Sequence, residues 1–157
     1  NTLSSMSEGI LVVDKELRDP GNLGTIIRTA EGAGMDAVIM SKETVDLFNP
    51  KVVRSTMGSI FRVPFFYVED MMQTVRELQV KGVSVVATDL QGKNDYDGER
   101  YPDKTAIVIG NEAKGISKEM RESADILIKI PMCGQLESLN ASVAAGIMMY
   151  ELFRQKK

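Results

Sequence analysis

Short apolar runs alternate with longer amphipathic stretches along the 157-residue chain. The apolar runs lack a strict alternation of polar and apolar positions, which is typical of strands that are covered on both faces. Strands are expected at Gly9–Val13, Ala37–Met40, Pro64–Val68, Val83–Thr88, Thr105–Ile109 and Ile126–Ile130. Since strands that alternate with helices favour a parallel sheet, we expect an α/β fold with a mostly parallel sheet flanked by helices.

The amphipathic stretches have recognisable helix ends. A turn at Asp19–Gly21 precedes the first helix, Gly34 and Gly82 stop two helices, and Asn49 with Pro50 forms a plausible helix start. Helices are expected at Asn22–Ala33, Asn49–Ile60, Asp70–Lys81, Ser117–Ser123 and Ser138–Arg154. The last helix is apolar on nearly all sides, which predicts that most of its surface is buried.

Composition narrows the possible chemistry. With 43% hydrophobic residues, the chain is expected to form one domain over residues 1–157. No apolar run reaches the roughly 20 residues of a membrane helix. There is no histidine and a single cysteine, Cys133, so neither a metal site nor a disulfide is expected. The lone cysteine fits a reducing cytoplasm.

The formal net charge of −3 argues against strong RNA affinity from this chain alone. A local basic patch in or near predicted loops is one alternative, and ordinary solvated surface charge is the other. The cations concerned are Arg28, Lys51, Arg54, Arg62, Lys93 and Lys114.

Three segments follow or lie near the ends of predicted strands, where ligands bind in open α/β sheets. In Asn22–Arg28, Asn22 is either a functional polar group or a helix cap, and Arg28 is either functional or a surface charge. The segment Ile109–Gly115 has two glycines but lacks the lysine of a phosphate loop, because Ile116 follows the second glycine. It is therefore a tight turn near a ligand, or a plain strand-to-helix turn.

The third segment, Ile130–Gly146, has a polar start followed by a run of small residues. Ser138 is a natural helix cap, and Asn140 lies in the first helical turn without a propensity reason to be there. The small residues after it would let another backbone pack closely. The polar stretch Gln91–Lys104 is long for a connection inside a compact domain, which indicates a functional or mobile loop.

Together these segments resemble the three motifs of the SpoU (TrmH) family of SPOUT methyltransferases, in the family's order, from about Leu11 to Leu152. The departure from the pattern is minor, with Ala141 where valine is more usual. The resemblance implies a C-terminal deep trefoil knot, S-adenosylmethionine as cofactor, and a homodimer formed through the C-terminal helix. It also implies that a small N-terminal RNA-binding domain of many relatives is absent from this fragment, which starts at Asn1 rather than methionine.

The resemblance further implies roles for individual residues. The catalytic residues would be Asn22, Arg28, Glu112, Ser138 and Asn140. The cofactor-binding residues would be Thr88, Leu90, Gly110, Ile130, Met132 and Leu139. Because a guanidinium group holds its proton very strongly, we expect Arg28 to stay charged and to stabilise the reacting oxygen or hold a phosphate, rather than to remove a proton.

The expected function is therefore S-adenosylmethionine-dependent methylation of an RNA ribose 2'-hydroxyl in the cytoplasm. Ribosomal RNA is the preferred substrate and transfer RNA the second. Two alternatives stay open: an inactive RNA- or cofactor-binding module of the same fold, and a metabolic α/β enzyme acting on a small molecule.

Overall fold

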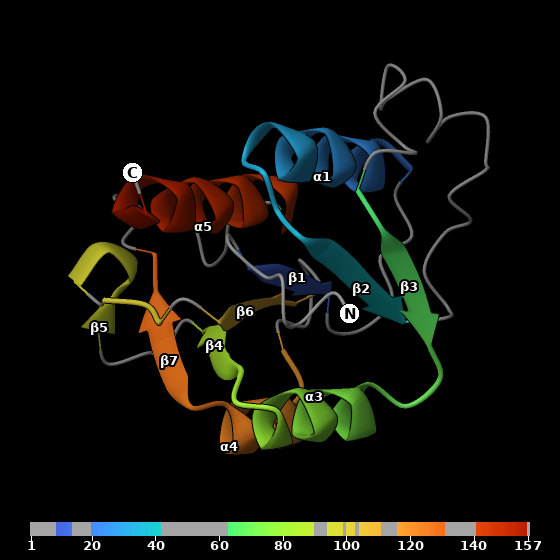
Figure 1. The fold of residues 1–157 in the computed structure, drawn as a ribbon, viewed down its shortest axis with the longest axis vertical. Helices are drawn as coiled ribbons and strands as arrows, with labels where there is room; N and C mark the ends of the chain where they lie inside the picture. Colours follow the sequence, from blue (N-terminus) through green and yellow to red (C-terminus); the bar gives the residue numbers. More distant parts are fainter. Residues whose placement is uncertain are drawn as a thin grey trace.

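The computed structural model describes residues 9–13, 20–41, 63–89, 94–98, 100–102, 104–110, 116–130 and 141–156. These residues form three layers, with a parallel sheet between two pairs of helices (Figure 1). The described sheet has seven strands in the order β3-β2-β1-β6-β4-β7-β5, and each neighbouring pair is parallel. The predicted α/β class with a parallel sheet is confirmed.

The predicted elements agree well with the described ones. The strands are β1 (Ile10–Val13), β2 (Ala37–Ser41), β3 (Phe65–Val68), β4 (Ser84–Thr88), β5 (Asn94–Asp95), β6 (Thr105–Ile109) and β7 (Ile126–Lys129). The helices are α1 (Pro20–Gly32), α3 (Met71–Val80), α4 (Lys118–Ser123) and α5 (Ala141–Lys156), with a short 3-10 turn η2 (Tyr96–Gly98). The helix predicted at Asn49–Ile60 and the predicted start of the last helix at Ser138 lie outside the described residues.

Two local predictions are wrong. Helix α1 begins at Pro20, inside the predicted turn, because proline is tolerated in the first helical turn, where its missing N–H has no helical partner. Asn22 therefore lies within the helix and is not its cap. The stretch Gln91–Lys104, predicted to be a polar loop, contains β5 and η2. Strand β5 was not predicted, because two polar residues show no hydrophobic periodicity.

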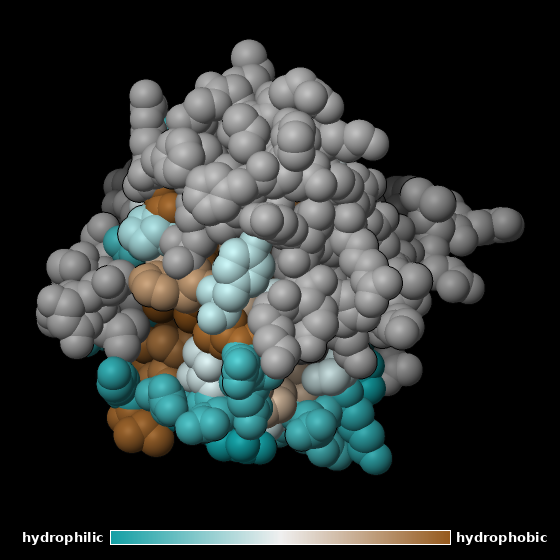
Figure 2. All heavy atoms as spheres, turned by 90° about the vertical axis from the view of Figure 1, so that its right-hand side faces the viewer, coloured by the Kyte–Doolittle hydropathy of each residue, from teal (hydrophilic) through white to brown (hydrophobic). Residues whose placement is uncertain are grey.

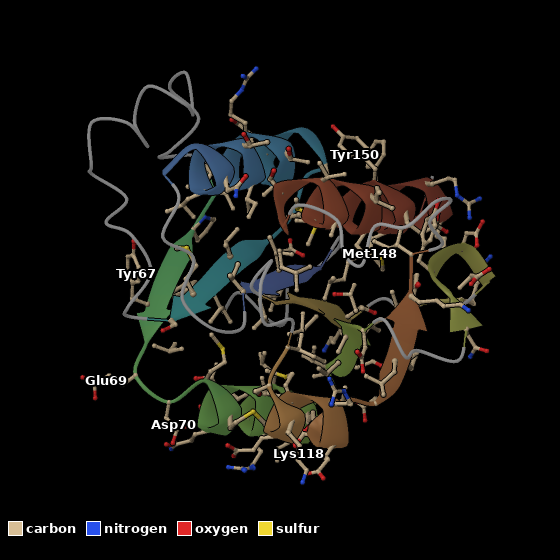
Figure 3. The ribbon with its side chains drawn as sticks, turned by 180° about the vertical axis from the view of Figure 1, so that it is seen from behind. Tyr67, Glu69, Asp70, Lys118, Met148 and Tyr150 are labelled. Atoms are coloured by element: carbon tan, nitrogen blue, oxygen red, sulfur yellow. The ribbon has the colours of Figure 1, made fainter. Side chains whose placement is uncertain are left out.

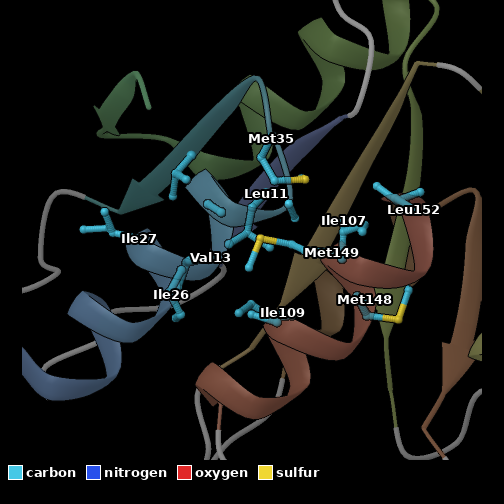
Figure 4. Packing of buried hydrophobic residues seen from close by; sticks show 14 of the residues in the cluster. Leu11, Val13, Ile26, Ile27, Met35, Ile107, Ile109, Met148, Met149 and Leu152 are labelled. Atoms are coloured by element: carbon cyan, nitrogen blue, oxygen red, sulfur yellow. The ribbon is translucent and has the colours of Figure 1, made fainter. Parts of the chain in front are cut away.

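The core consists of two apolar layers, one on each face of the sheet. Alternate side chains of β1 point to opposite layers: Leu11 and Val13 pack with α1 and α5, whereas Ile10 and Val12 pack with α3 and α4. Figure 4 shows the first layer, in which side chains of α1 and α5 meet those of β1 and β6. Both faces of the central strands are thus covered, as their continuous apolar pattern predicted.

Helix α5 lies beside α1 on the same face of the sheet (Figure 1). A Cβ atom on Gly146 would lie 3.6 Å from Thr29 Cγ2, which is an ordinary van der Waals distance. The α5 face turned to the sheet is buried, yet Val143 is 50% and Tyr150 45% exposed. Most of the described α5 side chains are buried or half-buried, as predicted, and the exposed residues Val143, Tyr150 and Arg154 form one stripe along the helix.

The exposed residues and the lengths of the helices show which kinds of surface and site the described residues offer. Edge strand β3 exposes Phe66 and Tyr67, and Figure 2 shows this side of the molecule, with hydrophobic residues next to hydrophilic ones. None of the described helices has the length and hydropathy needed to cross a membrane. No cluster of three or more His, Cys, Asp and Glu side chains suited to a metal occurs among the described residues.

Candidate active site

The strand order creates a switch point at the carboxyl edge of the sheet, between β1 and β6. The helix after β1 covers one face, whereas α4, which follows β6, covers the other (Figure 1). The last paired residues of these two strands are Val13 and Ile109, with Gly110 directly beyond. In open α/β sheets, such a point leaves a crevice in which ligands bind.

Three predicted cofactor residues lie at the ends of adjacent strands on one side of this point. Thr88 ends β4, Gly110 follows β6, and Ile130 follows β7, with β4 lying between β6 and β7. The Thr88 hydroxyl donates a hydrogen bond to the carbonyl oxygen of Val108, 3.2 Å away, so it is engaged with the neighbouring strand. Gly110 and Ile130 are half-buried, and Ile130 also packs against the first core layer.

The residues at the ends of β4, β6 and β7 fit an adenosine-containing cofactor. An adenine ring needs an apolar wall and in-plane hydrogen-bonding groups, and strand ends offer backbone N–H and C=O groups that no longer pair within the sheet. Ile130 supplies apolar surface, and Gly110 lets the backbone approach a ligand without a side chain in between. The described residues at this edge are therefore suited to backbone recognition of a nucleoside.

A buried polar pair lies on the other side, where α1 and α5 begin. The Ser142 hydroxyl donates a hydrogen bond to Asn22 Oδ1 over 3.2 Å, and the two residues are only 9% and 8% exposed. This bond joins the first turn of α1 to the first turn of α5. Because both helices follow parallel strands, their positive dipole ends lie together at the carboxyl edge, where negative charge is favoured.

Sequence reasoning did not assign a role to Ser142, although it belongs to the third motif. The signal was available, since Ser142 lies four residues after Ser138 and would share a helix face with it.

Arg28 is not part of this buried pair. It lies on α1, six residues after Asn22, which is about 9 Å along a helix axis. Its side chain is exposed, and within the described part of the chain no carboxylate pairs with it. A single chain therefore brings Asn22 and Ser142 together at the site but leaves Arg28 in solvent.

The other predicted site residues lie outside the described residues: Leu90, Glu112, Met132, Ser138, Leu139 and Asn140. Described neighbours in sequence do lie at the carboxyl edge. They are Asp89, Gly110 and Ile130 at strand ends and Ala141 at the start of α5. The three motif segments therefore enter or leave the same edge of the sheet.

A sequence model of the SpoU rRNA Methylase family matches residues 9–150, which include all three motif segments. The chain belongs to the SpoU rRNA methylase family. The resemblance inferred from the motifs is thereby confirmed.

The SpoU relatives include RNA methyltransferases from several bacteria. The chain is 41% identical, over 143 residues, to the 23S rRNA (guanosine(2553)-2'-O)-methyltransferase RlmP of Bacillus subtilis. It is 38% identical to the putative TrmH family tRNA/rRNA methyltransferase YacO of the same organism. These matches cover 91% and 93% of this chain but 57% and 58% of the relatives, so the chain spans a little over half of their length.

Solved SpoU structures have the same fold. An AdoMet-bound rRNA methyltransferase from Sinorhizobium meliloti superposes with a TM-score of 0.85 at 41% identity, covering 94% of this chain and 56% of that one. The A. aeolicus TrmH/SpoU tRNA modifying enzyme superposes with a TM-score of 0.84 at 32% identity, covering 95% of this chain and 75% of that one.

Proposed function

We propose that this chain is the catalytic domain of an S-adenosylmethionine-dependent methyltransferase that modifies an RNA ribose 2'-hydroxyl. The observation that carries the proposal is the family match over residues 9–150, and the described residues in or next to the three motif segments lie at the switch-point edge. Ribosomal RNA is the preferred substrate, because the B. subtilis relative at 41% identity is named for 23S rRNA. Transfer RNA is the second substrate class, in line with the name of the A. aeolicus enzyme.

The cofactor would lie at the ends of β4, β6 and β7. When bound, S-adenosylmethionine would supply an electrophilic sulfonium methyl group for transfer to the ribose oxygen, with the sulfur as leaving group and the hydroxyl proton passing to a carboxylate such as Glu112 or to an RNA phosphate. The residues that would hold it are Thr88, Leu90, Gly110, Ile130, Met132 and Leu139. Their task is to orient the cofactor and exclude water, since a sulfonium carbon reacts with an oxygen nucleophile without a metal.

The remaining motif residues would align the ribose hydroxyl and stabilise the charge that develops on its oxygen. Asn22, held by Ser142, would present its amide at the N-terminal end of α1. Glu112, Ser138 and Asn140 would complete the site. Arg28 would remain a cation that binds an RNA phosphate or stabilises charge on the reacting oxygen.

We also propose a cytoplasmic homodimer formed through α5, with a trefoil knot in the C-terminal part of each chain. The exposed Val143 and Tyr150 of α5 support the dimer, and Tyr150 packs edge-on against Phe153 with ring centroids 5.9 Å apart. Figure 3 shows Tyr150 on the outer side of α5, whereas Met148 points inward. Sedimentation analysis of the chain and of Tyr150→Asp tests the dimer, and a wild-type monomer at all concentrations contradicts it.

Calorimetric titration with S-adenosylmethionine tests the cofactor site directly. We expect saturable binding near one site per chain, and at least a tenfold loss of affinity in Gly110→Leu, because the new side chain would occupy the strand-end crevice. Gly98→Leu is the matched control, since among the described residues no atom outside the adjacent residues lies within 4 Å of a Cβ added there. No binding by a folded wild-type chain overturns the proposal.

A cofactor-binding module without catalytic activity is the second candidate. It is favoured by the exposure of Arg28 and by the net charge of −3. Transfer of a labelled methyl group to ribosomal or transfer RNA separates the two, because only the enzyme labels RNA at a ribose. Binding of the cofactor with no transfer to either RNA favours the module.

A further inference from the structure

Asp89 is a nearly buried carboxylate that none of the three motifs contains. It follows Thr88 at the end of β4, and its backbone N–H donates a 2.9 Å hydrogen bond to the carbonyl oxygen of Ile128 on β7. Its side chain is only 8% exposed and accepts a 2.5 Å hydrogen bond from Arg121 Nε on α4. Burying a carboxylate is costly unless charge and hydrogen bonds compensate it, so this pairing needs an explanation.

Arg121 is held in place by the helix that carries it. The neighbouring Met120 is fully buried, and Ile116, just before α4, is only 4% exposed, so both anchor α4 in the second core layer. The Ser117 side chain caps α4 by accepting a hydrogen bond from the Met120 N–H. The Arg121 guanidinium is therefore attached to a fixed element and reaches out to the end of β4.

The ion pair joins the two segments that would enclose the cofactor. Asp89 lies between Thr88 and Leu90, which belong to the proposed pocket, and α4 follows the second motif segment, which begins at Gly110. We propose that the Asp89–Arg121 pair positions the end of β4, at Thr88 and Asp89, for cofactor binding, with both side chains acting as positioning residues rather than as ligands. This inference rests on the proposed function.

The competing explanation is a purely structural pair, which contributes to stability and nothing else. The chain offers a matched control for that explanation. Arg154 donates a hydrogen bond to Glu151 across a 2.5 Å ion pair, and the Glu151 side chain is 6% exposed, close to the value for Asp89. This second pair lies within α5, toward the end of the helix away from the carboxyl edge.

The experiment is calorimetric titration of S-adenosylmethionine into the wild-type chain, Arg121→Gln, Asp89→Asn, the double variant, Arg121→Lys and Arg154→Gln. We expect Arg121→Gln and Asp89→Asn each to raise the Kd on the order of tenfold, because a small displacement of a positioning contact weakens binding of the correct geometry. The double variant should bind no more weakly than either single one, since both remove the same contact. Arg121→Lys should recover part of the affinity, and Arg154→Gln should bind as the wild type does.

Hydrogen exchange gives a readout that does not need the cofactor. The Asp89 amide should exchange faster in Arg121→Gln than in the wild type, with the thermal midpoint changed no more than in Arg154→Gln. Wild-type binding with an unchanged Kd in Arg121→Gln overturns this inference and leaves the proposed function intact. A Kd raised only in Asp89→Asn also overturns it, because Asp89 would then act without Arg121. No binding by the wild type overturns the proposed function and this inference together.

Discussion

Asn22 and Ser142 lie 120 positions apart in the sequence, yet their side chains form a hydrogen bond in a buried setting. The bond connects a residue predicted to be catalytic with one that the sequence did not single out. Because both belong to first helical turns, a change at one is transmitted directly to the position of the other. The polar half of the site is therefore held by tertiary structure rather than by either helix alone.

Replacement of Asn22 by alanine is expected to lower the free energy of unfolding by about 1–2 kcal/mol, because the buried Ser142 hydroxyl loses an acceptor. Urea unfolding followed by circular dichroism measures the effect. Thr25→Ala is the control, since the exposed Thr25 hydroxyl donates only to the Gly21 carbonyl of its own helix. Equal effects in the two variants would contradict a special role for the Asn22 contact.

Glu151 predicts a pH dependence of stability. The hydrogen bond from Arg154, aided by Gln155, holds the pKa of the Glu151 carboxyl below its ordinary value, against the opposing effect of burial. A pKa lowered by folding stabilises the protein above the unfolded value, and this contribution is lost as the pH falls toward the folded value.

We therefore expect the stability difference between wild type and Glu151→Gln to hold from pH 6 down to about 4.3, the usual carboxyl pKa, and to shrink only in the range below it. Urea unfolding at a series of pH values measures it. A difference that stays constant over this range would show that Glu151 titrates alike in both states.

At the scale of elements, the sequence predicted most of the fold because apolar runs and helix stops are local signals. The Gly82 N–H, for example, bonds to the Gln79 carbonyl at the end of α3, with φ of +92° at the glycine, which is the local geometry the sequence suggested. What it could not supply was the pairing of β6 between β1 and β4, or the contact of α5 with α1. Those depend on which strands meet in space, and so do the Asn22–Ser142 and Asp89–Arg121 pairs.

Alanine substitutions at Gly9 and Gly82 test how tightly the chain is packed where two elements are joined. Both have positive φ, +135° and +92°, so alanine strains the backbone at either position. At Gly9, however, a Cβ would lie 2.9 Å from the Thr105 carbonyl oxygen and 2.9 Å from Leu152, whereas at Gly82 no atom of the described part of the chain, apart from the adjacent residues, lies within 4 Å. We expect Gly82→Ala to cost about 1 kcal/mol and Gly9→Ala more than about 2 kcal/mol in chemical denaturation. Similar losses of stability in the two variants would show that β1 and α5 shift easily to accommodate the added methyl group.

At the scale of the whole molecule, a net charge of −3 limits how the domain can hold RNA. Most of the affinity of nucleic-acid binders comes from cations that displace counterions from phosphates. A domain with an acidic balance can offer only a few such contacts at the site. Under the proposed function, the remaining affinity would come from uncharged contacts at the site.

We accordingly expect RNA binding by this chain to depend less steeply on salt concentration than that of a basic nucleic-acid binder. With three or four phosphate contacts, a plot of log K against log salt concentration should have a slope of roughly −2 to −4. Fluorescence anisotropy with a labelled RNA between 50 and 200 mM salt measures the slope, and Arg28→Gln should reduce it by about one. A slope steeper than about −6 would indicate a larger basic surface than the proposal assumes.

The central place of β6 also bears on how the protein is made. When only the residues up to Thr88 have left the ribosome, the sequences of β1 to β4 are available. Strands β1 and β4 cannot yet join one sheet, because β6, which lies between them, has not been made. The nascent chain must therefore wait for Thr105–Ile109 before its two half-sheets can join, and for α5 before β1 and β6 are covered. Such long-range closure predicts that this domain folds only once α5 has left the ribosome, with exposed strands in the interval that would favour chaperone capture.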